Sequence, residues 1–156
     1  MKWINHKIIT FSLVYGATGD VLGSAIAGVA SIGPDWIEGK DFQSESWRKR
    51  HRTFSHWFLF WACLWFVFFL LSRDFVGKFT ISELFTGLGE ARVIYYVFFF
   101  ILTGWVLHII EDAISGGVPI INPFKKVYSF RLFRTGSFWE YFLSILAAIF
   151  VLIKLS

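Results

Sequence analysis

Seven ionisable side chains stand at or near the ends of long apolar runs in this chain, and their chemistry needs an explanation. Each one alone has a structural interpretation, because a single boundary histidine or acidic helix cap is common. Together they supply imidazole nitrogens and carboxylate oxygens, which are ligand types that zinc takes in proteins. The seven are His6, Asp35, His51, His56, His108, Asp112 and Glu140.

The spacing of His108 and Asp112 is the first feature that favours a metal site. Residues four apart on a helix share one face, one turn apart, so both side chains can reach the same ion. His51 and His56 are five apart, and an ideal helix would place them about 140° from each other. We therefore expect at least one of these two histidines to lie in a loop.

The composition predicts an integral membrane protein. Of 156 residues, 56% are hydrophobic and 17% are charged, whereas a soluble domain carries about 25% charged residues. The apolar residues form runs rather than amphipathic stripes. The single cysteine excludes an intrachain disulfide. The net charge of +4 comes without a DNA-binding motif, so we expect it to reflect membrane topology and expect no nucleic-acid partner.

Three apolar runs are each long enough to be predicted as a membrane span, since about 20 apolar residues cross a bilayer core of ~30 Å. His56 and Glu140 stand near the starts of the first and third runs, and Asp112 stands near the end of the second. The runs extend from Phe54 to Ser72, from Val93 to Ile114 and from Phe138 to Leu155.

The N-terminal apolar region is interrupted in its middle by Gly16, Gly19 and Asp20. A single straight helix would bury Asp20 near the bilayer centre at a cost of about 3 kcal/mol or more. We predict instead a helical hairpin, with one helix from about His6 to Tyr15 and a second from about Val21 to Ser31. Neither half is long enough to cross the bilayer alone.

These elements predict an all-α fold: a polytopic membrane helical bundle with three full transmembrane helices plus the N-terminal hairpin. Residues 1–156 form one membrane-embedded domain. The alternative is four full transmembrane helices, in which residues 8–32 cross the membrane. A straight first helix would separate His6 from Asp35 by over about 40 Å, whereas the hairpin brings all seven polar residues to one membrane face.

The basic residues predict which face that is. With the hairpin, 11 of the 15 Lys and Arg residues lie on the side of the N-terminus. The positive-inside rule then places the N-terminus, both basic loops and the polar cluster on the cytoplasmic side. With a full first span the division is 9 to 6, and the prediction of orientation is weak.

Several motifs follow one another along nearly the whole chain. The most specific are an H-R-x-x-[ST]-H block and a G-x-x-x-H-x-x-x-D helix ending. The matching residues are His6, Pro34-Asp35, His51-Arg52-Thr53-Phe54-Ser55-His56, Gly104, His108, Asp112, Gly117-Val118-Pro119, Asn122-Pro123, Phe130-Arg131-Leu132, Gly136 and Glu140. This series resembles the YdjM-like inner-membrane metal-dependent hydrolases, often labelled LexA-binding. The chain departs from the family pattern at Ile37, which replaces a second aspartate, and Glu38 follows it.

The resemblance implies a multi-pass hydrolase of the bacterial inner membrane. It carries one or two Zn²⁺ ions, with another divalent metal as an alternative. We expect the metal ligands to be His6, Asp35, His56, His108 and Asp112. Whether Glu38 takes the place of the second aspartate decides between one ion and two.

The expected mechanism is attack by a metal-activated water. His51 or Glu140 acts as general base or orients a ligand histidine, and Arg52 and Arg131 hold an anionic group such as phosphate. The expected partners are the lipid bilayer and a lipid-like or membrane-proximal substrate. A phosphoester lipid or isoprenoid phosphate fits the arginines, while a peptide or amide bond and a homo-oligomer both stay open.

Two other functions compete with hydrolysis. Intramembrane ionisable residues also mark the pathways of transporters and channels, but such a pathway needs more deep charges than Asp20 alone. A non-catalytic membrane subunit with a structural metal is the other alternative. Structural zinc sites are rich in cysteine, and Cys63 lies far from the polar cluster in the sequence, which favours a catalytic site.

Overall fold

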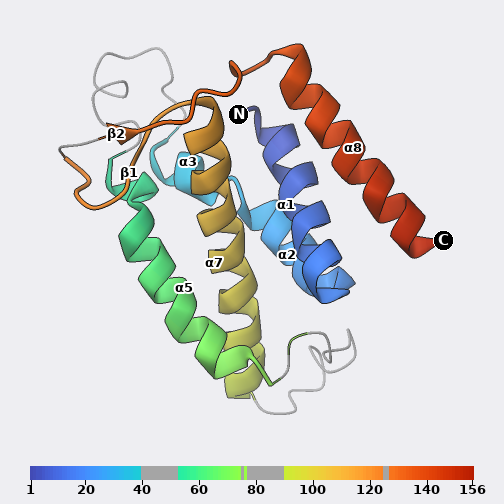
Figure 1. Ribbon diagram of the computed structural model, residues 1–156. Coiled ribbons are helices and arrows are strands. Elements are labelled where there is room, and N and C mark those ends of the chain that lie inside the picture. Colours follow the sequence, from blue (N-terminus) through green and yellow to red (C-terminus); the bar gives the residue numbers. More distant parts are fainter. Residues whose placement is uncertain (40–52, 75, 77–89, 125–126) are drawn as a thin grey trace.

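A computed structural model describes residues 1–39, 53–74, 76, 90–124 and 127–156 of the chain (Figure 1). Within this part the fold is a helical bundle, as predicted, apart from one pair of two-residue strands. Helix α7 packs against α2 on one side and α5 on another, while α1 packs against α2 and α8. The long helices are α1 (Trp3–Thr18), α2 (Val21–Ala30), α5 (Phe58–Ser72), α7 (Glu90–Ser115) and α8 (Phe138–Leu155).

The predicted N-terminal hairpin is present. Helix α1 ends at Thr18 and is capped by Gly19, whose φ of 68° is a left-handed conformation that glycine adopts without steric strain. Asp20 then caps α2 by accepting a hydrogen bond from the Gly23 amide at 2.8 Å. A Cβ at Gly28 of α2 would lie 3.1 Å from the Lys7 carbonyl oxygen. The two helices of the hairpin therefore run back along each other.

Helix α1 is longer than predicted, because Gly16 lies inside the helix instead of in the turn. A Cβ at Gly16 would lie 3.0 Å from the ring of Phe150 in α8. The absence of a side chain thus serves the packing of α1 against α8. The chain reverses at Gly19 and Asp20 alone.

Two short helical segments and a small hairpin surround one end of the bundle (Figure 1). They are α3 (Gly33–Ile37), the 3₁₀ helix η1 (Phe54–His56), and antiparallel strands β1 (Val118–Pro119) and β2 (Val127–Tyr128). The C-terminal end of α7 and the N-terminus of the chain lie at the same end of the bundle.

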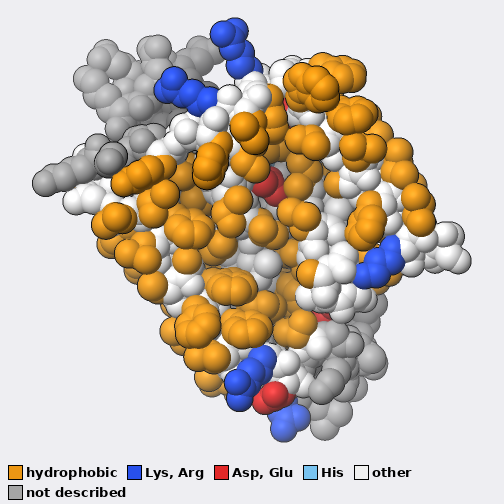
Figure 2. Space-filling view, viewed as in Figure 1, with side chains coloured by type: hydrophobic (Ala, Val, Ile, Leu, Met, Phe, Trp, Pro, Cys, Tyr) orange, Lys and Arg blue, Asp and Glu red, His pale blue; other side chains and the backbone are white. Residues whose placement is uncertain are grey.

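Among the described residues, two helices are long and apolar enough to cross a membrane: α7 from Ala91 to Ser115, and α8. Helix α5 has 15 residues, about 22 Å at 1.5 Å per residue, which is shorter than the predicted span. It begins at Phe58 rather than Phe54, because η1 and the extended Trp57 precede it. Figure 2 shows a largely apolar outer surface on this face of the bundle.

Candidate metal centre

Four side chains from three segments converge at one end of the bundle. Asp35 comes from α3, His56 from the end of η1, and His108 and Asp112 from the last turns of α7. One ligand atom from each residue can be chosen so that all four atoms lie within 4.8 Å of one another. Both histidines are fully buried, and Asp112 is 2% exposed. The predicted pairing of His108 with Asp112 on one helix face is therefore present.

Five of the six donor–donor distances within this cluster are close to the edge of a tetrahedron around a metal ion. Two nitrogens bound to one zinc at 2.0–2.1 Å with tetrahedral angles lie about 3.3 Å apart. The Nε2 atoms of His56 and His108 are 3.2 Å apart. Asp35 Oδ1 lies 3.5 Å from each of these nitrogens. Asp112 Oδ2 lies 3.6 Å from His56 Nε2 and 3.9 Å from His108 Nε2.

The charges of the cluster also fit a divalent cation. Two neutral imidazoles and two carboxylates carry a charge of −2, which burial makes unfavourable unless a cation compensates it. Burial alone would lower the pKa of His56, but hydrogen bonds to Asp112 and Asp35 outweigh it and raise that pKa to about 10. Burial alone would raise the pKa of Asp35, but hydrogen bonds to His108 and His56 hold it below its usual range. Without a metal ion, a proton on His56 thus compensates part of the negative charge of the carboxylates.

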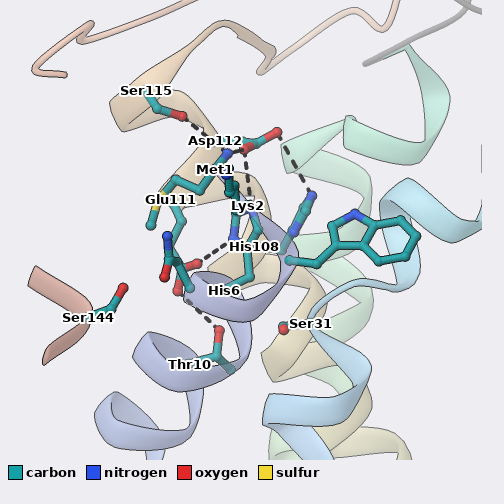
Figure 3. Close-up of polar contacts among 12 residues, drawn as sticks. Met1, Lys2, His6, Thr10, Ser31, His108, Glu111, Asp112, Ser115 and Ser144 are labelled. Carbon is teal, nitrogen blue, oxygen red and sulfur yellow. Dashed lines mark hydrogen bonds and ion pairs between the residues drawn. The ribbon is translucent and has the colours of Figure 1, made fainter. Parts of the chain in front are cut away.

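His6 lies beside the four-residue cluster and contacts it through Asp112 (Figure 3). Its Nε2 atom is 3.4 Å from Asp112 Oδ1, the oxygen that does not face the other two histidines. The same Oδ1 accepts a hydrogen bond from the amino group of Met1 at 2.6 Å. The imidazoles of His6 and His108 lie with ring centroids 4.1 Å apart. The structure therefore places His6 within the polar centre but outside the group of four.

A buried glutamate orients His6, and the sequence analysis did not assign it a role. Glu111 Oε2 lies 2.5 Å from His6 Nδ1, and Thr10 donates a hydrogen bond to Glu111 Oε1 at 3.1 Å. Glu111 is 3% exposed. Its position inside an apolar run was a signal, because an ionisable residue at membrane depth usually has a function. Its partner on α1 could be identified only from the tertiary structure.

Glu38 plays the same part for His56. Its Oε1 atom lies 3.1 Å from His56 Nδ1 and also accepts a hydrogen bond from Ser55. Glu38 is therefore placed behind a candidate ligand, on the ring nitrogen that faces away from the cluster. The four-residue group leaves Glu38 out. This geometry favours a supporting role for Glu38 over replacement of the second aspartate.

Glu140 is buried, but its carboxylate is occupied by donors that are not part of the cluster. It accepts hydrogen bonds from the Lys2 amide at 2.6 Å, the Asn5 side chain at 2.5 Å and the Gly136 amide at 2.6 Å. These contacts join the start of α8 to the start of α1. The arrangement gives Glu140 an evident role in fixing the N-terminal segment that carries His6.

Of the three remaining predicted site residues, the structure describes only Arg131. Arg131 lies in the segment before α8, at the end of the bundle that holds the cluster, and lines a cavity with Ser115 of α7. His51 and Arg52 lie outside the described residues, so their predicted roles stay predictions.

Comparison with known proteins shows which family the chain belongs to. The family model described as YdjM inner membrane protein matches residues 1–155. No curated protein and no solved structure matches the chain. The match covers essentially the whole chain, and α7 and α8 are long and apolar enough to cross a membrane. The chain therefore belongs to the YdjM inner membrane protein family and is an inner membrane protein.

Proposed function

We propose that this protein is a membrane-bound metal-dependent hydrolase whose divalent ion is held by Asp35, His56, His108 and Asp112. The observation that supports it most strongly is the convergence of four donor atoms within 4.8 Å of one another, with five of their six separations between 3.2 and 3.9 Å. Nitrogen and oxygen donors in a tetrahedral arrangement suit zinc. When bound, zinc supplies a water whose pKa is lowered toward 7.

Asp35 is the most exposed of the four proposed ligands. Its side chain is 14% exposed, whereas the exposed fractions of the His56, His108 and Asp112 side chains are 0 to 2%. Its Oδ2 atom accepts a hydrogen bond from the Trp3 indole at 2.9 Å, which holds the carboxylate in place. The α3 side is therefore the more open side of the four-residue group.

His6 is the best-placed proton acceptor among the described residues. Glu111 orients the imidazole through Nδ1, and Nε2 lies 3.4 Å from Asp112 Oδ1. Burial alone would lower the pKa of His6, but hydrogen bonds to Asp112 and Glu111 outweigh it and raise that pKa. The Nε2 atom is buried and has no hydrogen-bond donor among the described residues. This pairing of a base with an orienting carboxylate is the arrangement that general-base catalysis needs. We assign this role to His6 in place of Glu140.

The substrate is proposed to be a lipid or a phosphoester at the membrane surface. The centre lies at the ends of two membrane-length elements, α7 and α8. The distribution of Lys and Arg supports the cytoplasmic face. A transporter has less support, because within the described residues the buried ionisable side chains other than Asp20 gather at this one end.

The proposal is tested by incubating the purified full chain, loaded with zinc, with a membrane lipid extract and with soluble phosphoesters. Mass spectrometry then compares the substrates and products. We expect wild type and Cys63→Ser to convert at least one compound, because Cys63 is exposed and outside the centre. Asp112→Asn and His6→Gln should reduce that conversion by about 100-fold or more, the range expected for loss of metal activation or of a general base.

The result that contradicts hydrolysis is a folded, zinc-containing wild type that converts none of these compounds. Equal conversion by wild type and Asp112→Asn would also contradict it. Helicity by circular dichroism shows that each variant is folded.

A further inference from the structure

A cavity of about 530 Å³ lies at the C-terminal end of α7, on the side of the segment that precedes α8. Its wall is formed by Ser115, Arg131, Leu132, Phe133 and Arg134. Ser115 is the last residue of α7 and follows Asp112 by three positions, so the two side chains are neighbours on one helix face. The amino group of Met1 contacts Asp112 at 2.6 Å and Ser115 Oγ at 3.4 Å (Figure 3). The cavity therefore begins one turn beyond a proposed ligand.

The backbone around Arg131 is fixed to the end of α7. The Phe130 amide donates to the Ala113 carbonyl and the Leu132 amide donates to the Ile114 carbonyl, both at 2.9 Å. These two hydrogen bonds satisfy carbonyl groups that a helix end would leave without partners. Arg131 stands between the two anchors, so its position relative to Asp112 is determined by main-chain contacts.

Arg131 also adopts a backbone conformation that an arginine rarely takes. Its φ is 47°, and it is the only residue other than glycine with positive φ in the described part of the chain. Such conformations persist where surrounding contacts impose them, and they gather at ligand sites. Here the flanking hydrogen bonds impose the conformation, and the result is an arginine held at the wall of the cavity.

The chemistry of the cavity is that of an anion site. Two guanidinium groups, from Arg131 and Arg134, and the hydroxyl of Ser115 contribute hydrogen-bond donors. Within the part of the chain that the structure describes, neither guanidinium forms an ion pair with an acidic side chain. Planar guanidinium groups bind phosphate through paired hydrogen bonds more effectively than other side chains do.

We propose that this cavity binds the phosphate group of the substrate, with Arg131 and Arg134 as its main donors, and so places a phosphate ester beside the metal centre. This inference rests on the proposed hydrolase function and narrows its substrate class to phosphate esters. It adds Arg134 and Ser115 to the arginine that the sequence had indicated.

The test measures binding of inorganic phosphate to the zinc-loaded full chain in detergent by titration calorimetry. The variants are Arg134→Gln and Arg131→Asn, because asparagine tolerates a positive φ. The control is Arg73→Gln, which removes the same charge from an exposed site next to the far end of α5. We expect each cavity variant to weaken phosphate binding about tenfold or more, as for loss of a charge-assisted hydrogen bond. Arg73→Gln should bind phosphate as wild type does.

Two further probes separate the sources of phosphate. A short-chain phosphatidic acid that binds more tightly than glycerol phosphate indicates a lipid headgroup, and equal binding indicates a soluble phosphate ester. Either result supports the subsite if binding of the phosphate compound is weakened by Arg134→Gln. Phosphate binding that is unchanged in both cavity variants overturns the subsite, and so does acetate binding as tightly as phosphate.

Zinc content measured on the same samples distinguishes failure of the subsite from failure of the proposed function. Wild type that holds zinc, with phosphate binding independent of both arginines, refutes the subsite and leaves the metal centre standing. Wild type without zinc, but with phosphate binding that requires Arg134, refutes the hydrolase and supports the anion site.

Discussion

His56 and His6 each present one ring nitrogen to the polar centre and the other to a glutamate. Glu38 serves His56 and Glu111 serves His6. In metal sites such carboxylates fix the tautomer and orientation of the imidazole and make it a stronger donor. Glu38 and Glu111 therefore determine how the two imidazoles are oriented toward the polar centre.

Substituting Glu38 should weaken metal binding without changing the number of ions bound. Glu38→Gln keeps the shape but removes the charge behind His56, and loss of such a partner lowers metal affinity about 10- to 100-fold. Competition with a zinc-chelating dye measures this. Asp74→Asn, which removes an exposed acidic charge next to the far end of α5, is the matched control. Equal affinity of wild type and Glu38→Gln would show that Glu38 does not support a ligand.

Metal affinity should rise with pH. The pKa of His56 is raised to about 10 without metal, so its imidazole is protonated at pH 7 and must lose that proton to bind an ion. One released proton makes the dissociation constant fall about tenfold for each pH unit between pH 6 and 8. Calorimetry in two buffers of different ionisation enthalpy counts the protons. Zinc binding with no proton release would contradict this protonation state.

At the residue scale, the sequence predicted all four side chains that the structure brings together in the candidate metal centre. His108 and Asp112 could be paired because four residues make one helical turn. The roles of Glu38, Glu111 and Glu140 could not be predicted, because each depends on a partner that lies far away in the chain. Spacing along one helix carries no information about which side chain faces a given ring nitrogen across a helix interface.

At the scale of elements, two close contacts position the centre. At Gly104 of α7, a Cβ would lie 2.3 Å from the Ala27 carbonyl oxygen of α2. At the hairpin turn, Tyr96 of α7 donates its hydroxyl to Asp20, 2.8 Å from both carboxylate oxygens. The first contact lies one turn before His108, and the second fixes the opposite end of α2.

Gly104→Ala should destabilise the fold and disturb the metal centre. The contacted atoms belong to the backbone of α2, so the helices must separate, and overpacking of this kind costs about 1 to 3 kcal/mol. We expect a lower apparent Tm in detergent and lower zinc occupancy, because His108 moves with α7. Gly16→Ala is the control, since there a Cβ meets only the ring edge of Phe150. Equal stability and zinc occupancy in both variants would argue against close packing at Gly104.

Asp20 and Tyr96 should be energetically coupled. Asp20→Ala removes both the cap of α2 and the acceptor for Tyr96, and Tyr96→Phe removes only the hydroxyl. Since contacting residues are non-additive, a double-mutant cycle should give a coupling of about 0.5 to 3 kcal/mol. Unfolding by denaturant in detergent measures it. Additive effects would mean that the hydroxyl does not hold the hairpin turn in place.

The sequence predicted the hairpin because Gly19 and Asp20 combine a helix end with a helix cap. It placed Gly16 in the turn as well, because the role of a glycine in packing against α8 cannot be recognised from local sequence. It also began the first of the three apolar runs at Phe54, because Phe54 and Trp57 are aromatic, like many residues of α5. Composition does not separate a 3₁₀ turn from the helix that follows it.

At the scale of the whole molecule, the described part of the chain is an apolar helical bundle whose buried ionisable groups lie almost entirely at one end. This separation could be predicted, because the hairpin and the apolar runs return the chain repeatedly to the same face. The central claim is that Asp35, His56, His108 and Asp112 bind a divalent metal ion there. It is independent of the substrate and of the number of membrane crossings.

The most direct test is elemental analysis of the purified full chain after saturation with zinc and removal of excess metal. We predict about one tightly bound zinc per chain for wild type and for Cys63→Ser, which removes the only thiol. His108→Asn and Asp112→Asn, which preserve side-chain size approximately, should lose most of that zinc while keeping their helicity. Wild type without zinc, or folded His108→Asn and Asp112→Asn proteins that hold as much zinc as wild type, would contradict the account.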